Sequence, residues 1–423
     1  MTDTHPLIGR VHLDPHRDNW GEHLVDVWTD DQILFDRPLQ AWRRCTRDEL
    51  GLATDRPVVA TGHQTLLWHP GILAKYLALD AFAGATNVGV ANLVVDQHVN
   101  RFGSFDLPVQ RTDGSWQVRT LHLAAPRPDV PMSLHDPVAP PRPHHLPEQL
   151  ALDDELDHAL RTGLDAILDR VAAHVDASNL ARQMAAALSD LMQPWVDPLT
   201  HVSATQLTET RFSRRVLEAL VSDPQTAIAR YNEAVASVPE AGIGPLLVRD
   251  DYVEVPLWRI RPDGRRMRAY DADVERWLEG DDLTLMPRAL YMTAMLRLTM
   301  CDLFIHGTGG GLYDRAMERW MADWLGVRPA PAATVTADVH LPLLDPSDRD
   351  RPPDLAGARA RYRHTWHDPL PHDARLSAAK AAWLARIDAL PRGSAERRRA
   401  FRAMHLDLAR WRADRSDAVQ EAA

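Results

Sequence analysis

Two short polar segments, each between an apolar run and a helical pattern, contain the residues best suited to chemistry. The first, residues 61–64 (Thr-Gly-His-Gln), follows the apolar residues 58–60 and precedes His69, Pro70 and Lys75. The pattern predicts a buried strand, a tight polar turn and a helix that begins at Pro70. A polar loop at a helix N-terminus presents backbone N–H groups and a partial positive charge to an anion. We therefore expect an anion-binding site here.

Lysine is rare in this chain. Only Lys75 and Lys380 are lysines among the 48 Lys and Arg residues. In a chain that otherwise uses arginine, a lysine is favoured where a compact, flexible ammonium is needed. The alternative is that Lys75, in the second turn of its helix, is only a solvated surface residue.

The second segment has a similar layout. Residues 303–306 (Leu-Phe-Ile-His) predict another buried strand, and residues 307–311, four of them glycine, lead into a helix over 312–325. Glycines let the backbone approach a ligand closely, but this run matches neither the P-loop nor the spaced dinucleotide-binding fingerprint. His306 at the strand end, and Tyr313 with Asp314 in the first helical turn, are candidate binding residues. The alternatives are structural: a tight turn, a core histidine and a favourable charge at a helix N-terminus.

Two more groups of residues are candidates. Asp96 and His98 stand at the end of a second, largely apolar strand over 88–96, where they could orient an amine or act as a base. Arg288 could bind a carboxylate, although a surface ion pair would explain it equally well. Because ligands collect at the carboxyl ends of the strands in open α/β sheets, we expect the two strand–loop–helix segments to face one cleft.

Composition limits the class of protein. The 423 residues have 45% hydrophobic and 25% charged side chains, as in soluble globular proteins, and are enough for two or three domains. The net charge of -11 argues against a nucleic-acid partner. Cys45 and Cys301 are too far apart for a disulfide framework or a CxxC pair. With neither a signal-peptide pattern nor an apolar run of membrane-spanning length, the sequence predicts a cytoplasmic protein without a membrane partner.

Proline-rich stretches divide the chain. Before the first of them, apolar strands alternate with a helix over 71–83, which predicts a parallel sheet covered on both faces. After it, periodicity predicts helices over 150–175, 179–192, 206–221 and 224–238, then strands over 245–249 and 252–260. From about residue 373 the pattern predicts two amphipathic helices, broken at 391–393, that pack on the body of the protein or on a second subunit.

Several of these segments resemble the bacillithiol cysteine-adding enzymes, the cysteine ligases. Residues 61–64, with Pro70-Gly71 and Lys75-Tyr76, resemble the Thr-Gly-Gln-Gln loop, Gly-Pro and Tyr-Lys region of that family. Further similar segments follow in the family's order over 94–98, 223–232, 253–258 and 285–290, so that the resemblance covers roughly residues 55–330. The chain departs from the family at His63, where the family has Gln, and in its short tail, where the family has a coiled coil. The segment 306–311 with Tyr313 and Asp314 matches a divergent branch better.

The resemblance implies an α/β fold with a Rossmann-like parallel sheet core, an inserted helical domain and a short C-terminal helical tail. The corresponding divisions are the N-terminal half of the core (1–125), a Pro-rich crossing (126–149), the helical insertion (150–240), the second half of the core with the Gly-rich loop (241–328), a Pro-rich linker (329–354) and the C-terminal helices (355–423). A homodimer through those helices is the expected protein partner.

The implied reaction joins the carboxyl group of cysteine to the amine of glucosaminyl malate, both small-molecule substrates, in low-molecular-weight thiol biosynthesis. Activation of the carboxyl group would use a nucleotide, ATP or ADP, and no metal is predicted. The expected catalytic residues are Asp96, His98 and His63. The expected binding residues are Gln64, His69, Lys75, Arg288, His306, Gly307, Gly309, Gly310, Tyr313 and Asp314.

Two alternatives stay open at this point. A metal-dependent hydrolase would use His63, His69, Asp96, His98 and His306, which are suitable ligands for a divalent metal at spacings that are not diagnostic. A non-catalytic relative would bind a nucleotide or sugar with the same cleft, because a fold does not fix a function.

Overall fold

The computed structural model describes residues 9–22, 24, 32–64, 69–99, 104–110, 116–123, 127, 129–140, 158–339, 374–391 and 394–414. The chain forms two compact units, Met1–His340 and Leu341–Ala423. The candidate residues all belong to the first unit. None of the described helices is long and apolar enough to cross a membrane.

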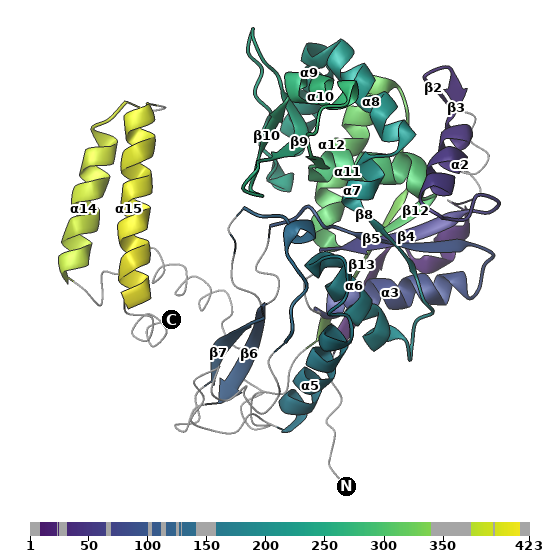
Figure 1. Ribbon diagram of the computed structural model, residues 1–423, viewed down its shortest axis with the longest axis horizontal. Helices are drawn as coiled ribbons and strands as arrows, with labels where there is room; N and C mark the ends of the chain where they lie inside the picture. Colours follow the sequence, from purple (N-terminus) through teal and green to yellow (C-terminus); the bar gives the residue numbers. More distant parts are fainter. Residues whose placement is uncertain are drawn as a thin grey trace. The chain divides into compact units, whose positions relative to one another are not determined.

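A six-stranded sheet, counted over the described residues, forms the centre of the first unit (Figure 1). Its order is β1-β13-β12-β4-β5-β8, and only β1 runs antiparallel to its neighbour. The strands are β1 (Gly9–Asp14), β4 (Val58–His63), β5 (Gly89–Val94), β8 (Thr200–Ser203), β12 (Leu303–His306) and β13 (Ala332–Val339). The expectation of an α/β fold with a mostly parallel sheet is confirmed.

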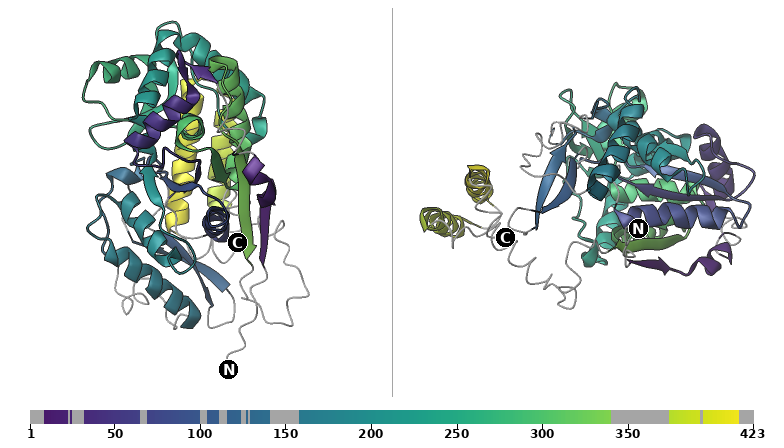
Figure 2. Two further views of the ribbon diagram at one scale, coloured as in Figure 1. Left: turned by 90° about the vertical axis from the view of Figure 1, so that its right-hand side faces the viewer. Right: turned by 90° about the horizontal axis from the view of Figure 1, so that it is seen from below.

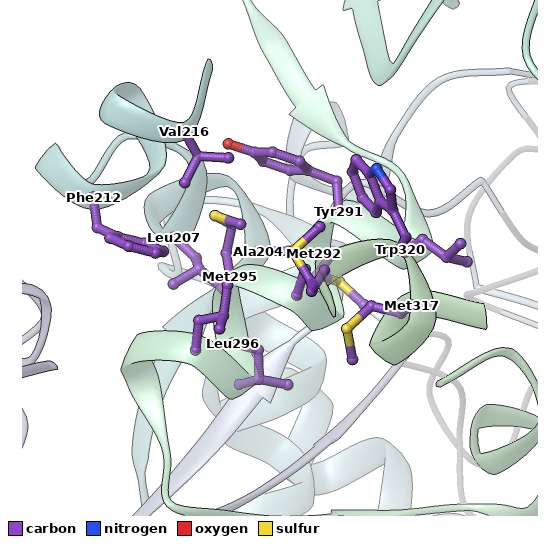
Figure 3. Packing of buried hydrophobic residues seen from close by; sticks show 14 of the residues in the cluster. Ala204, Leu207, Phe212, Val216, Tyr291, Met292, Met295, Leu296, Met317 and Trp320 are labelled. Atoms are coloured by element: carbon purple, nitrogen blue, oxygen red, sulfur yellow. The ribbon is translucent and has the colours of Figure 1, made fainter. Parts of the chain in front are cut away.

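Helices cover both faces of this sheet. Successive residues of a strand point to opposite sides, so the apolar residues of β4 lie in two different cores. Val59 of β4 packs against α3 (Pro70–Ala83). Val58 and Ala60 face the larger core, which Figure 3 shows from close by. Helices on that side are α2 (Leu39–Glu49), α7 (Ala204–Thr208), α8 (Arg211–Ser222), α9 (Pro224–Ala236), α11 (Ala289–Met295) and α12 (Thr308–Leu325).

A small antiparallel sheet lies beside this core and holds further site residues. Its order is β10-β9-β11, with β9 (Glu254–Ile260), β10 (Arg266–Tyr270) and β11 (Leu285–Pro287). The remaining elements of the first unit are β2 (Ile33–Leu34), β3 (Arg37–Pro38), β6 (Ser104–Gln110), β7 (Trp116–His122), α5 (His158–Ala173), α6 (Leu180–Met192), α10 (Asp271–Glu279) and a π-helical turn over Leu296–Met300.

Several segments differ from the sequence-based expectation, and the expected strand over 245–249 contains only an isolated bridge between Val248 and Val253. The helical segment 150–240 contains β8, a four-residue strand that a Ser203–Gln206 capping box ends, and the expected helix over 206–221 is two helices, α7 and α8. The expected linker 329–354 contains β13, because its first prolines precede the strand and leave the backbone ladder intact. The rest of that linker lies outside the described residues.

The glycine run also differs, since it is not a loop. Gly309 to Gly311 lie in the first turn of α12, which begins at Thr308 with Gly307 as its N-cap. A Cβ atom on Gly310 would lie 1.5 Å from Cε1 of the His306 ring. This close approach explains why glycine stands there.

The second unit contains the expected pair of helices, α14 (Ala374–Asp388) and α15 (Ala395–Asp414). They lie side by side in each view (Figure 1, Figure 2). Ile387, Ala400, Met404 and Leu408 are buried between them. The predicted break at residues 391–393 falls between the two helices, although residues 392 and 393 lie outside the described part of the chain.

Candidate functional site

A cavity of about 720 Å³ lies at the carboxyl ends of β4, β5 and β12. Its walls also include the N-terminal ends of α3 and α12 and residues of the small sheet. All predicted site residues except Asp96 and Asp314 line it, namely His63, Gln64, His69, Lys75, His98, Arg288, His306, Gly307, Gly309, Gly310 and Tyr313. The expectation that the two strand–loop–helix segments face one cleft is therefore confirmed.

His306 is fixed at the end of β12. Its Nδ1 accepts a hydrogen bond from the N–H of Gly307 at 3.0 Å, and its Nε2 lies 3.2 Å from the hydroxyl of Tyr313. Burial and the charge of Lys75 lower the pKa of His306 to about 3, so the ring is neutral. Since Nδ1 accepts, Nε2 carries the proton and donates to Tyr313. The hydroxyl proton of Tyr313 is then available to a ligand in the cavity.

His63, at the end of β4, is neutral for the same reasons. Burial, with the charge of Lys75 second, lowers its pKa to about 3. Its Nδ1 contacts the carbonyl oxygen of Gln64, which makes Nδ1 the protonated nitrogen. Nε2 of His63 is then a hydrogen-bond acceptor at the cavity wall.

Lys75 is buried in the wall of the cavity, with 3% of its surface exposed. The alternative that it is a solvated surface residue is therefore wrong. Its Nζ donates to the carbonyl oxygen of Gly62. Burial lowers the pKa of this lysine from 10.5 to about 7. His69, by contrast, accepts from the N–H of Gly71 at 3.1 Å and acts as the N-cap of α3, while its side chain still lines the cavity.

Arg288 reaches the cavity from the small sheet. Its Nε donates to the carbonyl of Leu257 at 3.0 Å and its Nη1 to Glu254 at 2.8 Å. The guanidinium carbon lies 4.0 Å from the ring centroid of Trp258, and that of Arg266 lies 4.4 Å from it. Nη2 of Arg288 is buried and has no hydrogen-bond partner among the described residues. Arg288 is thus not a surface ion pair, and one of its donors is unused.

His98 and Gln97 line the cavity after β5. Burial, and secondly the charge of Arg266, lower the pKa of His98 to about 4. Within the described part of the chain, Nδ1 of His98 and Oε1 of Gln97 are buried atoms without a hydrogen-bond partner. Two buried polar atoms of this kind are costly unless a ligand or water satisfies them.

Asp96 and Asp314 do not line the cavity. Asp96 is turned to the N-terminus of α7, where it accepts from the N–H of Thr205 at 3.1 Å and from its hydroxyl. Burial raises the pKa of Asp96. Asp314 accepts from Arg297 at 3.0 Å inside the core, and burial raises its pKa to about 6. In both cases a distant donor holds the carboxylate away from the site.

Sequence reasoning missed Arg266, Trp258 and Gln97. Arg266 and Trp258 lie on strands of the small sheet. They line the cavity only because of tertiary packing, which the local periodicity of the sequence does not show. Gln97 could have been found, since it stands between Asp96 and His98, which were both candidates.

The side chains that line the cavity give it a positive character. Lys75, Arg266 and Arg288 are its basic residues, and no aspartate or glutamate is among the described residues that line it. α12 begins here without a side-chain cap, which directs the partial positive charge of its N-terminus toward the cavity. The arrangement suits a ligand with at least one phosphate or carboxylate group.

No group of three or more His, Cys, Asp or Glu residues in the described part of the chain is arranged to hold a metal ion. In comparisons with known proteins, neither a family model nor a curated protein matches this chain.

Proposed function

We propose that the protein is an enzyme that forms an amide between the carboxyl group of a cysteine-like amino acid and the amine of a glucosaminyl malate-like amino sugar. The observation that carries the proposal is the positively charged cavity at the carboxyl ends of β4, β5 and β12. Both substrates of this reaction carry carboxylates, and an activated acyl group adds a phosphate. The motif at residues 61–64, on which the resemblance to the cysteine ligases depends, lies in the wall of this cavity.

The sheet order supports a Rossmann-like core. With the parallel strands counted along the chain, the order is 3-2-1-4-5, and the order reverses between β4 and β12. In folds with this order, ligands bind at the reversal, outside the carboxyl ends of the strands. His63 and His306 end these two strands. In this proposal the inserted part of the segment 150–240 does not include β8, which belongs to the core sheet.

The residues suit the binding steps of such a reaction. The N-terminal turn of α12 and the Tyr313 hydroxyl would hold the phosphate of a nucleotide or of the activated acyl group. Arg288, with its unused Nη2 donor, and Arg266 would bind a substrate carboxylate. ATP or ADP would supply the activation. The positive surroundings disfavour an ammonium, which helps to keep the attacking amine neutral and nucleophilic.

A thermal-shift series with ATP, ADP, cysteine and glucosaminyl malate tests the binding part, since a ligand of the native state raises its stability. The assay for amide formation is mass spectrometry of the mixture. Arg288→Met should abolish the shift by the amino sugar, and Arg265→Met, an exposed neighbour of the small sheet that does not line the cavity, is the matched control.

The alternatives give different results in the same series. A non-catalytic relative would bind a nucleotide or sugar and release no product. A metal-dependent hydrolase would shift with a divalent cation alone. An absence of any shift would contradict the proposal.

A further inference from the structure

We propose that Lys75 is the proton acceptor for the attacking amine, an inference that rests on the proposed amide-forming function. Lys75 lies in the wall of the cavity, in the second turn of α3. The structure assigns it a different chemistry from the other buried cations of this protein.

The other cations buried among the described residues, Arg43, Arg47 and Arg297, have carboxylate partners. Arg47 lies 2.6 Å from Asp302, with Arg43 at 3.8 Å from the same carboxylate. Arg297 lies 3.0 Å from Asp314. These pairs stabilise permanent charges inside the protein.

Lys75 has no such partner among the described residues. The interaction of its Nζ is with a neutral acceptor, the carbonyl oxygen of Gly62. The titratable groups that face it are His63 from β4 and His306 from β12, with His69 nearby at the start of α3. His63 and His306 are neutral, so no negative charge offsets a buried ammonium.

The consequence is a lysine that exchanges a proton near neutral pH. Burial brings its pKa to about 7, so that about half of the molecules carry a free amine at that pH. A general base works best when its pKa lies near the working pH. His63, with a pKa of about 3, and His98, with a pKa of about 4, are weaker bases. Asp96 is occupied by Thr205.

The substrate ammonium gives one proton to Nζ of Lys75. Its nitrogen lone pair then forms the C–N bond to the carbonyl carbon of an acyl phosphate, the co-reactant. The C–O bond to phosphate breaks, and phosphate leaves with the electron pair. The second proton lost from nitrogen leaves with the phosphate or with solvent.

The sequence permits a direct test with acetic anhydride, which acetylates only unprotonated amines and does not itself titrate in this range. In a Lys380→Arg background, Lys75 is the single lysine of the chain. The acetylation rate constant of Lys75, followed by peptide mass spectrometry without any substrate, should reach half of its plateau near pH 7. A rate that keeps rising to pH 10 would overturn the inference.

The role in the reaction is tested on kcat. Lys75→Arg keeps the charge but cannot accept a proton, so kcat should fall by about 10²–10⁴-fold while the thermal shift with ATP persists. Lys75→Met, which leaves an uncharged side chain of similar length, shows whether the fold tolerates the loss of the amine. Full kcat in Lys75→Arg would overturn the role of Lys75 and leave the proposed function standing. An absence of amide from the wild type would refute the proposed function, and the role of Lys75 with it.

Discussion

Replacing Lys75 by methionine should stabilise the folded protein at neutral pH, although it removes a hydrogen bond. The reason is the fall of the lysine pKa from 10.5 to about 7 on folding. Since one pKa unit is worth ~1.4 kcal/mol, this fall corresponds to roughly 5 kcal/mol against folding when both states are protonated. The lost hydrogen bond to Gly62 offsets about 1 kcal/mol of the gain. A net gain of about 3–4 kcal/mol is expected.

The gain in stability from Lys75→Met should decrease as pH rises above 7. Below pH 7 the lysine is protonated in the folded and unfolded states, and the full cost is present. Between about pH 7 and 10.5 the unfolded state binds more protons than the folded state, so wild-type stability rises with pH relative to the variant. Roughly 2 kcal/mol of the cost remains at pH 9, and near pH 10 the remaining cost equals the lost hydrogen bond, so the advantage of methionine disappears.

Urea unfolding of both proteins at pH 6, 7, 8, 9 and 10 measures this difference. Lys75→Arg is the matched control, because arginine keeps its charge over the whole range and should gain nothing as pH rises. A Lys75→Met variant that is less stable than the wild type at pH 7, or a gain that is the same at every pH, would refute the reasoning.

Other substitutions test the remaining parts of the site. Gly310→Ala should displace the ring of His306 and abolish the thermal shift by anionic ligands, whereas Gly309→Ala, whose Cβ meets no protein atom within 4 Å, should leave that ring in place and be up to about 1 kcal/mol more stable. Arg288→Met should weaken binding of the carboxylate substrate by about 10–100-fold in calorimetry, and equal weakening by Arg265→Met would argue against a specific contact. Asp96→Asn should lower stability by about 1–2 kcal/mol in urea unfolding and leave kcat within a few-fold, and a large loss of kcat would return Asp96 to the catalytic residues.

The sequence predicted the parts of the site that depend on local pattern. The apolar strands at 58–60 and 303–306, the helix that begins at Pro70 and the pair of C-terminal helices are confirmed. Because the carboxyl ends of parallel strands meet at one edge, residues 240 positions apart could be assigned to a single cleft.

The site predictions fail for residues whose orientation depends on a partner that is far away in the sequence. Asp96 and Asp314 have the residue type and position of site residues, but Thr205 and Arg297 hold their carboxylates elsewhere. Trp258 and Arg266 reach the cavity only because the small sheet packs beside the core. β8 has only four residues, and β13 follows directly after two prolines, Pro329 and Pro331, which made its segment resemble a linker.

The reaction itself is the most direct test of the account. Purified protein incubated with cysteine, glucosaminyl malate and ATP should yield the amide product in mass spectrometry, and Arg288→Met should yield much less at the same substrate concentrations. Binding of both substrates without any amide product would contradict the central claim that this cavity forms the amide bond.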